Sequence, residues 1–267
     1  MSGKTDLLSE ILHIAQTAAI KAGRLAFNAV GRSAVSAKSS TNLVTEADVE
    51  AEKMIITLIA AAFPGHEILA EETSAGVRPD VPNLWIVDPI DGTNNYAHGI
   101  PHCAVSVAYA QGGEVLAGVV YDIFRKELFS AVKGGGAFLN DRPISASRAA
   151  TIEESIVATG FHYDRSGDLA ERTLQATRRL LKANIRDIRR FGSAALDFCW
   201  VASGRLDGYF EYMLSPWDYA AGMLIAREAG AVCLDRNGDE MTLSTTGVII
   251  ATRALKGALV QEVRWGD

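Results

Sequence analysis

Positions 84–93 read Leu-Trp-Ile-Val-Asp-Pro-Ile-Asp-Gly-Thr, and this stretch decides how the rest of the chain is interpreted. Its first four residues are apolar, which predicts a short buried strand. Asp88 and Asp91 follow that strand, three residues apart. Because an unpaired charge is costly to bury, two carboxylates at the end of a buried strand indicate either a site that uses them or a simple turn.

The loop that carries these aspartates is stiff. Pro89 fixes φ and removes a backbone donor, while Gly92 permits a tight bend. Asp88, the Ile90 carbonyl and Asp91 therefore project from one small arc. Clustered carboxylate and carbonyl oxygens are the ligands that Mg²⁺ prefers. The alternative is an Asp-Pro, Asp-Gly turn without a ligand, and ten residues alone do not exclude it.

The composition is that of an ordinary globular protein. The chain has 267 residues, of which 48% are hydrophobic and 22% are charged. That length allows one large domain or two packed halves with a substantial core. The formal net charge of −6 argues against a general nucleic-acid-binding surface.

The cysteines and the first residues of the sequence favour a cytoplasmic protein. Cys103, Cys199 and Cys233 are odd in number and widely spaced, so neither a disulfide framework nor a zinc site is expected. We see no signal peptide, and charged residues interrupt the apolar stretch at 7–29, which argues against a membrane span. We therefore expect a protein of a reducing compartment with no membrane partner.

Hydrophobic periodicity predicts helices and strands that come in blocks. Helices are expected at 7–29, 45–64, 169–183, 193–203, 215–230 and 255–263. Strands are expected at 68–70, 84–87, 104–110, 115–121, 127–132, 137–139, 155–159, 206–211, 231–235 and 247–251, with an antiparallel meander between 104 and 132. Loops are expected at 31–44 and 161–168, and a turn at 140–143. This order predicts stacked layers of helix pairs and sheets rather than a doubly wound parallel sheet.

Several acidic residues have a structural explanation at this point. Asp48 is the last residue of Thr-Glu-Ala-Asp, which has the form of a helix capping box, and on spacing alone capping is its favoured role. Glu71 and Glu72 would by themselves be solvated loop charges. Asp218 is the last residue of Ser-Pro-Trp-Asp, which starts a helix with Ser as the cap and Pro at the first helical position.

Two further features favour a structural role. The sequence Gly134–Gly136 suggests a phosphate-binding loop, but neither Gly-Lys-Ser/Thr nor a helix follows it, so a turn is expected. A dense basic cluster consists of Arg178, Arg179, Lys182, Arg186, Arg189 and Arg190. A solvated helix face or a subunit contact is the common meaning of such a cluster, and an RNA-contacting patch is the alternative.

The candidate acids share one feature, since Glu71, Asp88, Asp91 and Asp218 each lie at the end of an apolar strand or the start of a helix. A fold can bring such positions together in one cleft. Ala-Glu-Glu at 70–72, the Asp-Pro-Ile-Asp-Gly-Thr loop, and Trp-Asp-Tyr-Ala-Ala-Gly at 217–222 together resemble the inositol monophosphatase family. The order and spacing of the three motifs match, and the resemblance covers nearly the whole chain.

The resemblance implies a fold of mixed α/β (α+β) class. This is the layered α-β-α-β-α sandwich of the inositol monophosphatase and fructose-1,6-bisphosphatase type. A single domain would span residues 1–267, with a metal-loop half at 1–145 and a substrate-side half at 146–267. The family is typically homodimeric and inhibited by Li⁺, and we expect both properties here.

The resemblance also implies a site with two or three Mg²⁺ ions. Glu71, Asp88 and the Ile90 carbonyl would hold one ion, while Asp88, Asp91 and Asp218 would hold a second. Glu71 would also reach a third ion. Two cations bridged by one carboxylate suit phosphate-ester hydrolysis, because one activates a water and the other stabilises the departing alkoxide. Attack on the phosphoryl group would then be in line, without a covalent intermediate.

Catalytic residues carry over from the family by position. Thr93 and Asp48 would orient and deprotonate the attacking water, together with Glu71 at the metal. The helix cap competes with this role for Asp48, since one side chain would not readily serve both. His102 and Cys103 follow the metal loop and are expected to pack in the core.

Substrate contacts follow the same resemblance. Backbone N–H groups of Gly92 and Thr93 can donate to phosphate oxygens, beside Asp91. A helix amino terminus favours an anionic or polyol ligand as well. The residues expected to bind the inositol hydroxyls are Gly192, Ser193, Ala194 and Glu211.

The expected activity is Mg²⁺-dependent hydrolysis of a small phosphorylated polyol, with inositol 1-phosphate as the leading substrate. Asn94 stands where Thr is usual in the family and Tyr96 where Phe is common, which leaves the substrate open. Fructose-1,6-bisphosphatase, histidinol phosphatase and 3′-phosphoadenosine 5′-phosphate phosphatase share the metal site and are the alternatives. A different class of function is a binding partner of RNA or of the transcription machinery, through the basic cluster at 178–190.

Overall fold

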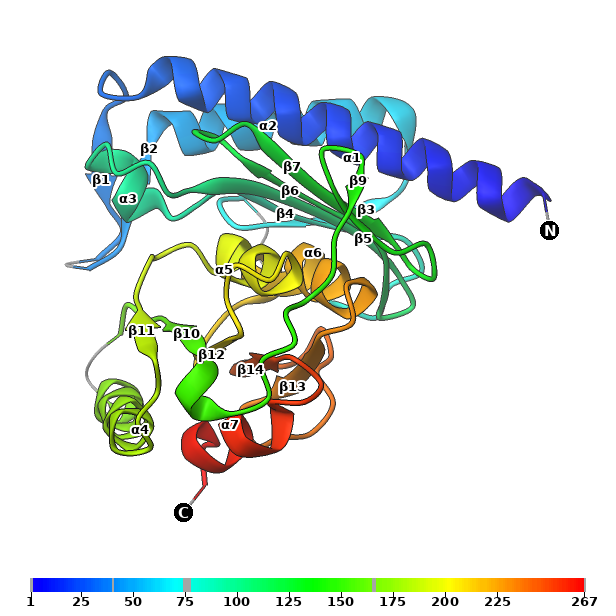
Figure 1. Ribbon diagram of the computed structural model, residues 1–267. Coiled ribbons are helices and arrows are strands. Elements are labelled where there is room, and N and C mark those ends of the chain that lie inside the picture. Colours follow the sequence, from blue (N-terminus) through cyan, green and yellow to red (C-terminus); the bar gives the residue numbers. More distant parts are fainter. Residues whose placement is uncertain (1, 40, 74–77, 165–166, 267) are drawn as a thin grey trace.

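The computed structural model describes residues 2–39, 41–73, 78–164 and 167–266, and its helices and sheets stack in five layers (Figure 1). The first layer is a pair of helices, α1 (Ser2–Ala29) and α2 (Glu46–Ala62). Both pack on one face of a seven-stranded sheet, α1 mainly on its centre and α2 near one side. Alanine and isoleucine side chains of the two helices meet the sheet in a continuous apolar core.

The seven-stranded sheet is a meander with strands in chain order. Its first two strands pair in parallel and the following neighbours pair antiparallel. The strands are β3 (Glu67–Ala70), β4 (Leu84–Asp91), β5 (Ala104–Gln111), β6 (Glu114–Asp122), β7 (Glu127–Val132), β8 (Ala137–Leu139) and β9 (Arg142–Pro143).

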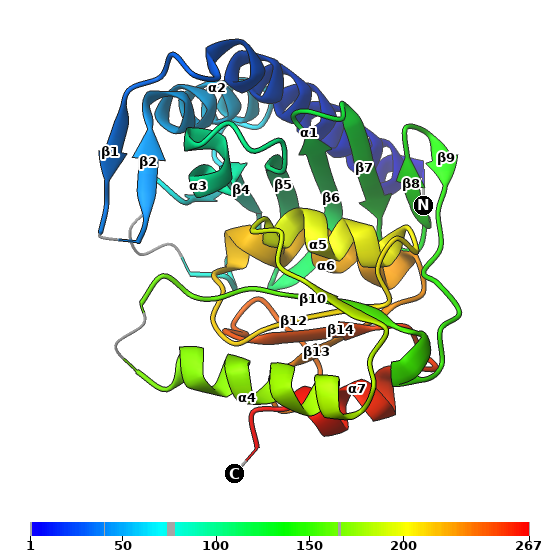
Figure 2. The same cartoon turned by 60° about the vertical axis from the view of Figure 1, so that its left-hand side comes forward.

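The middle layer consists of α5 (Ala194–Ala202) and α6 (Pro216–Glu228), which lie between the two sheets (Figure 2). Helices buried on both sides are expected to be apolar all round. Eight of the nine α5 residues, and the run from Tyr219 to Ala226 in α6, are indeed buried. Their side chains join residues of both sheets in one hydrophobic cluster, which fixes the position of the helix starts beside the end of β4.

The second sheet has five strands in the order β11-β10-β12-β14-β13. Its strands are β10 (Ile156–Thr159), β11 (Asp187–Arg189), β12 (Gly208–Glu211), β13 (Val232–Asp235) and β14 (Val248–Ala251), and a 3₁₀ turn at Ile152–Glu154 precedes β10. The outer helices α4 (Leu169–Lys182) and α7 (Lys256–Val263) cover its other face and complete the α-β-α-β-α order predicted from the sequence.

Two segments differ from the sequence prediction. The strand expected at 84–87 continues to Asp91, with a shift in its pairing to β5 between Asp88 and Asp91. A bulge tolerates Pro89 inside a sheet, which a regular strand does not. The expected loop at 31–44 contains two short antiparallel strands, β1 (Val35–Ala37) and β2 (Leu43–Thr45). Residues of β1 are exposed, so they carry no hydrophobic alternation that a sequence pattern could reveal.

Smaller elements also escaped prediction. The helix α3 (Thr93–Ala97) directly follows the Asp-Pro-Ile-Asp-Gly segment at 88–92. The strands β11 and β9 have only two or three residues and lie at sheet edges. The glycines at 134–136 form a turn, as expected. Its backbone N–H groups at Gly134 and Gly136 donate to the Glu228 carboxylate at 2.8 and 2.9 Å. The anion held by this turn is therefore one of the protein's own side chains.

Within the described ranges, we find no helix whose length and apolarity would let it span a membrane.

His102 lies buried beside the site and is expected to make the fold sensitive to acid. Its ring stacks on Phe191 and meets Trp200 edge-on, each with centroids 5.0 Å apart. Neither ring nitrogen has a hydrogen-bond partner in the part of the chain that the structure describes. Burial, with a smaller contribution from Arg125, lowers the pKa of His102 from 6.5 to about 4.

Because the unfolded chain binds this proton more tightly, the contribution of neutral His102 to stability is lost as pH falls from about 6.5 towards 4. We expect a loss of about 2–3 kcal/mol in the free energy of unfolding between pH 7 and 4.5, at roughly 1.4 kcal/mol per pKa unit. Urea unfolding of wild type and His102→Phe at both pH values measures it. His102→Phe should lack the part of the loss in unfolding free energy that comes from protonation of His102. Equal losses in the two proteins would show that His102 does not titrate this way.

Candidate active site

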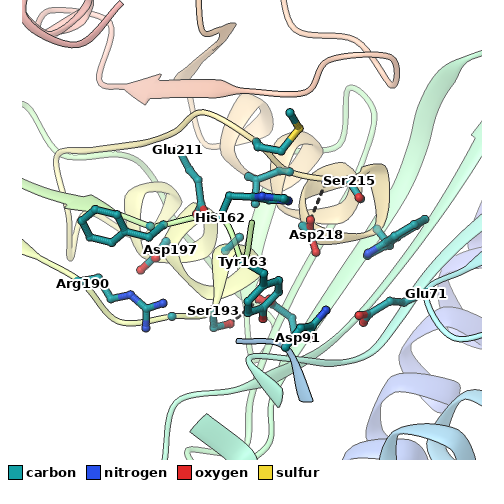
Figure 3. A pocket seen from close by; sticks show the side chains of 18 residues that line it. Glu71, Asp91, His162, Tyr163, Arg190, Ser193, Asp197, Glu211, Ser215 and Asp218 are labelled. Carbon is teal, nitrogen blue, oxygen red and sulfur yellow. Dashed lines mark hydrogen bonds between the residues drawn. The ribbon is translucent and has the colours of Figure 1, made fainter. Parts of the chain in front are cut away.

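A pocket of about 200 Å³ opens where the end of β4, the start of α5 and the start of α6 converge (Figure 3). The two halves of the sequence both contribute to it. Its lining includes Glu71, Asp91, Tyr163, Arg190, Ser193, Asp197, Glu211 and Asp218.

Three carboxylates lie together at the floor of this pocket, and two of them, Asp91 and Asp218, line it. Asp88, Asp91 and Asp218 each offer an oxygen within 4.8 Å of the other two. Two of them come from the bulged end of β4, and Asp218 comes from the first turn of α6. The motifs at 88–93 and 217–222, which the sequence analysis singled out, therefore do meet in space.

The protein fixes one oxygen of each of these carboxylates. Oδ2 of Asp91 accepts hydrogen bonds from the Ser193 hydroxyl at 2.5 Å and the Ala195 N–H at 2.7 Å. Oδ1 of Asp88 accepts from its own loop, and Oδ2 of Asp218 accepts from the N–H of Ser215 at 2.6 Å. These bonds orient the carboxylates without using both oxygens of any one of them.

Burial dominates the electrostatics of the three acids. It raises the pKa of Asp91 to about 6, against the effect of the bonds from Ser193 and Ala195. Burial raises the pKa of Asp88 and Asp218 well above the ordinary range, and the neighbouring carboxylates add to this. Three ionised carboxylates that lie close together and are shielded from solvent are unfavourable unless a cation lies among them. The donor set consists of hard oxygens, so it fits Mg²⁺.

Glu71 lines the pocket but is not one of the three clustered acids. Burial raises its pKa to about 7, and the ammonium of Lys38 counteracts that shift. Lys38 lies 3.1 Å from Glu71 and 2.6 Å from Glu72. The buried carboxylate of Glu52 in α2 accepts from the N–H of Glu72 at 2.8 Å, and so fixes the turn that carries both glutamates.

Asp48 both caps α2 and contacts Thr93. Its Oδ2 accepts from the N–H and hydroxyl of Thr45, at 2.8 and 2.5 Å, which completes the predicted capping box. Its Oδ1 accepts from the Thr93 hydroxyl at 3.1 Å. The helix cap and the contact with Thr93 use different oxygens of Asp48, so both contacts are present together.

Gly92 lies where the end of β4 packs against the loop that precedes α5. Its φ of +94° lies in the left-handed region, which favours glycine. A Cβ at this position would lie 3.0 Å from the Gly192 carbonyl oxygen and 3.1 Å from that of His102. The backbone at 92 and 93 is thereby held against the loop that precedes α5. Ala194 begins that helix, and Ser193 caps it by accepting from the N–H of Leu196 at 3.4 Å.

Glu211 lies at the end of the pocket away from the three acids. Burial raises its pKa to about 7, and its Oε2 accepts from the Tyr209 hydroxyl at 2.5 Å. A Cβ on Gly160 would lie 1.8 Å from that same oxygen, so glycine at 160 leaves the room that Glu211 occupies. Asp197 and Arg190 line the same end.

The sequence did not single out Tyr163, Arg190 and Asp197, which line this pocket, or Lys38, which pairs with Glu71 and Glu72. Lys38 and Tyr163 come from segments predicted as loops, where no periodicity points to a role. Arg190 was counted with the basic cluster, and Asp197 lies inside an apolar helix pattern. The isolated charge of Asp197 among apolar neighbours was the one usable signal, since charges are seldom fully buried.

Comparison with known proteins gives a consistent family. The model of the inositol monophosphatase family matches residues 7–265. Inositol-1-monophosphatase of Mesorhizobium japonicum is 38% identical over 259 residues, covering 96% of this chain and 97% of that protein. Nus factor SuhB of Escherichia coli K12 is 39% identical over 257 residues, covering 95% and 96%.

Solved structures agree with this assignment. The crystal structure of extragenic suppressor protein suhB from Bartonella henselae superposes with a TM-score of 0.89 at 36% identity, covering 97% of this chain and 100% of that one. The three acidic motifs, the layered fold and these similarities point to one conclusion. The chain belongs to the inositol monophosphatase family, whose members are phosphatases of small phosphorylated substrates.

Proposed function

We propose that this protein hydrolyses the phosphate monoester of a small polyol, with inositol 1-phosphate as its principal substrate and Mg²⁺ as its cofactor. The observation that carries the proposal is the group of three carboxylates at the floor of the pocket, of which Asp88 and Asp91 are buried and Asp218 is half-buried. We further propose a cytoplasmic, Li⁺-sensitive homodimer, in keeping with the family resemblance.

The proposed metal ligands follow from the donor set. Asp88, Asp91 and Asp218 would hold one Mg²⁺, and Glu71, Asp88 and the Ile90 carbonyl a second, with a third ion at Glu71. When bound, these ions supply acidification of a water and neutralisation of the charge on the departing alkoxide. The carboxylates are already oriented by their bonds to Ser193, Ser215 and the loop itself, so little reorganisation would accompany binding.

The chain's own groups would then orient the attacking water and the phosphate. The Thr93 hydroxyl contacts Asp48 at 3.1 Å and the Ile90 carbonyl at 3.0 Å, which supports a role beside the proposed metal ligands. We propose that Thr93 and Asp48 orient the water and take its proton. Backbone N–H groups at 92 and 93 would donate to phosphate oxygens, in a left-handed turn that suits an anion.

The far end of the pocket would bind the polyol. Glu211 is a hydrogen-bond acceptor held in place by Tyr209 and Gly160, and polyol hydroxyls are donors. Ser193 and the start of α5 lie between this end and the three acids. We propose that Gly192, Ser193, Ala194 and Glu211 contact hydroxyl groups while the phosphate lies over the carboxylates.

Wild-type enzyme is expected to prefer inositol 1-phosphate by at least about tenfold in kcat/KM, because a site built for hydroxyl groups rejects ligands that leave it unpaired. The measurement is Mg²⁺-dependent phosphate release from inositol 1-phosphate, fructose 1,6-bisphosphate, histidinol phosphate and 3′-phosphoadenosine 5′-phosphate, with and without Li⁺. Preference for another member of the panel would retain the metal chemistry and replace the substrate. No release from any of them would refute the proposal.

A second candidate is a role as a partner of the transcription machinery. It is favoured by the name of the relatives, Nus factor SuhB, and by the exposed basic residues of α4. Arg178 and Lys182 are exposed beside Leu174 and Leu181, which are 53% and 61% exposed. The double variant Arg178→Glu, Lys182→Glu lies outside the pocket, so loss of a complex with RNA polymerase at unchanged phosphate release would support this role. Arg190 is unsuitable for that test because it lines the pocket.

A further inference from the structure

Two hydrogen bonds connect the metal loop to the opposite wall of the pocket. The side-chain N–H of Asn94, in α3, donates to the Thr41 carbonyl at 3.0 Å. The Thr41 hydroxyl donates in turn to the Tyr163 carbonyl at 2.7 Å. Thr41 lies between β1 and β2, and Tyr163 lies between β10 and α4. Three segments far apart in the sequence are thereby tied together at the pocket.

The β1–β2 ribbon that carries Thr41 has a second attachment. Lys38 of the same ribbon pairs with Glu71 and Glu72, on the other side of the site. The ribbon is therefore fixed at both the carboxylate side and the Tyr163 side. Because the β1–β2 ribbon is fixed at Lys38, the hydrogen bond from Thr41 gives the backbone of Tyr163 a defined position at the pocket.

Tyr163 directs its side chain towards the carboxylate floor. It lines the pocket, and in Figure 3 it lies next to Asp91. Burial raises the pKa of Tyr163, and Asp91, Asp218, Glu71 and Asp88 each raise it further. The phenol thus stays protonated at neutral pH and is a neutral donor in the lining of the pocket.

A neutral donor at this position suits one kind of ligand. A phosphate monoester bound over the carboxylates would present oxygens that accept hydrogen bonds, and a phenol can donate one without adding charge to the site. Among the described residues, none of the acids accepts a hydrogen bond from this phenol, so its donor is not committed to them.

We propose that Tyr163 is a substrate-binding residue that donates its phenolic hydrogen bond to the phosphoryl group, and that Asn94 and Thr41 are positioning residues that hold it there. This inference rests on the proposed phosphatase function. It also explains the departure at position 94, where Thr is usual in the family. The longer carboxamide reaches the Thr41 carbonyl, which begins the chain of bonds.

The first experiment compares Tyr163→Phe with wild type in steady-state hydrolysis of inositol 1-phosphate. A hydrogen bond to a charged ligand group predicts a fall in kcat/KM of roughly 10- to 100-fold, with the Mg²⁺ concentration for half-activation unchanged. Tyr109→Phe is the matched control, because that buried phenol donates to Asn83 away from the pocket. It should lose stability without losing kcat/KM. A Tyr163→Phe enzyme within twofold of wild type would overturn the role of the phenol.

The second experiment tests the positioning residues by a double-mutant cycle. Thr41→Val should lower kcat/KM in the wild-type background and have little further effect in the Tyr163→Phe background. Thr41→Ser keeps the hydroxyl and should restore activity. Asn94→Ala should behave like Thr41→Val. These bonds would not act through Tyr163 if the losses in kcat/KM of Thr41→Val and Tyr163→Phe multiplied in the double variant. The same would follow if Thr41→Ser were no more active than Thr41→Val.

Direct binding separates failure of this inference from failure of the proposed function. Calorimetric titration of inorganic phosphate into Mg²⁺-loaded wild type and Tyr163→Phe needs no turnover. If wild type binds phosphate without hydrolysing any monoester, the function fails while weaker binding by Tyr163→Phe still supports the inference. Equal binding by the two proteins overturns it, and absence of binding by wild type overturns both.

Discussion

Replacing Asp91 with Asn is expected to abolish Mg²⁺-dependent phosphate release, by roughly 10³-fold or more in kcat/KM. A metal ion stabilises transition-state charge by several kcal/mol, and about 4 kcal/mol corresponds to 10³ in rate. Asp91 is one of the three acids whose oxygens lie within 4.8 Å of one another, so its charge is central to the proposed site. Phosphate release from inositol 1-phosphate, with Mg²⁺ titrated, measures the effect.

The same substitution should leave the fold intact. The amide oxygen of Asn can accept the two bonds that Asp91 Oδ2 receives from Ser193 and Ala195. Without Mg²⁺ the variant should be at least as stable as wild type, because the buried carboxylate of Asp91, one of three acids that lie close together, is gone. With Mg²⁺, wild type should gain in Tm and the variant should gain less, since binding to the folded state stabilises it.

Asp197→Asn is the matched control for Asp91→Asn. Asp197 is also buried and lines the same pocket, but it lies outside the group of three acids. This variant should keep the Mg²⁺-induced gain in Tm. The three-carboxylate metal site would be wrong if Asp91→Asn showed the same Mg²⁺-induced gain in Tm as Asp197→Asn. It would also be wrong if Asp91→Asn retained activity within tenfold of wild type.

The layers and the acidic floor could be predicted because their signals are local or shared by a family. Amphipathic stretches predicted the outer helices, and the Asp-Pro-Ile-Asp-Gly-Thr string indicated where a strand gives way to a site. The β1–β2 ribbon could not be predicted in this way. Its strands have three residues each and β1 is exposed, so the roles of Lys38 and Thr41 depend on contacts with residues 33 and 122 positions away.

The basic cluster at 178–190 also shows that contacts cannot be predicted from the sequence alone. Sequence proximity grouped six cations at 178–190 as one feature, yet their contacts differ. Arg189 pairs with Asp187, Arg179 donates to the Glu262 carbonyl, and Arg190 lines the pocket. Charge density along a chain predicts a surface, whereas the partner of each charge is set by tertiary structure.

Asn94 and Tyr96, the two residues that depart from the family pattern, each donate a hydrogen bond in this fold. Asn94 reaches the Thr41 carbonyl, and the Tyr96 hydroxyl donates to the Ala26 carbonyl near the end of α1 at 2.7 Å. Both bonds need an atom that Thr or Phe would not supply at that position. Neither bond is visible to a motif search, because the acceptors lie 53 and 70 residues away.

Thr93→Val and Thr45→Val make the same chemical change on opposite sides of Asp48, and we expect different results. Thr93→Val should lower kcat by roughly 10²-fold, which is the usual scale for loss of water activation by a positioned base. The half-activating Mg²⁺ concentration should not change, because the hydroxyl is no ligand in the proposed site. Its removal takes away the donor to Asp48 Oδ1 and to the Ile90 carbonyl.

Thr45→Val removes the hydroxyl that caps α2 and leaves Thr93 in place. It should cost about 1 kcal/mol in the free energy of unfolding, as loss of an N-cap does, and reduce kcat much less than Thr93→Val. Urea unfolding and steady-state kinetics on both variants give the comparison. Equal kinetic losses would mean that Asp48 acts only through the position of α2. A kinetic loss confined to Thr93→Val would assign the two oxygens of Asp48 separate roles, one in holding the helix and one in orienting the water.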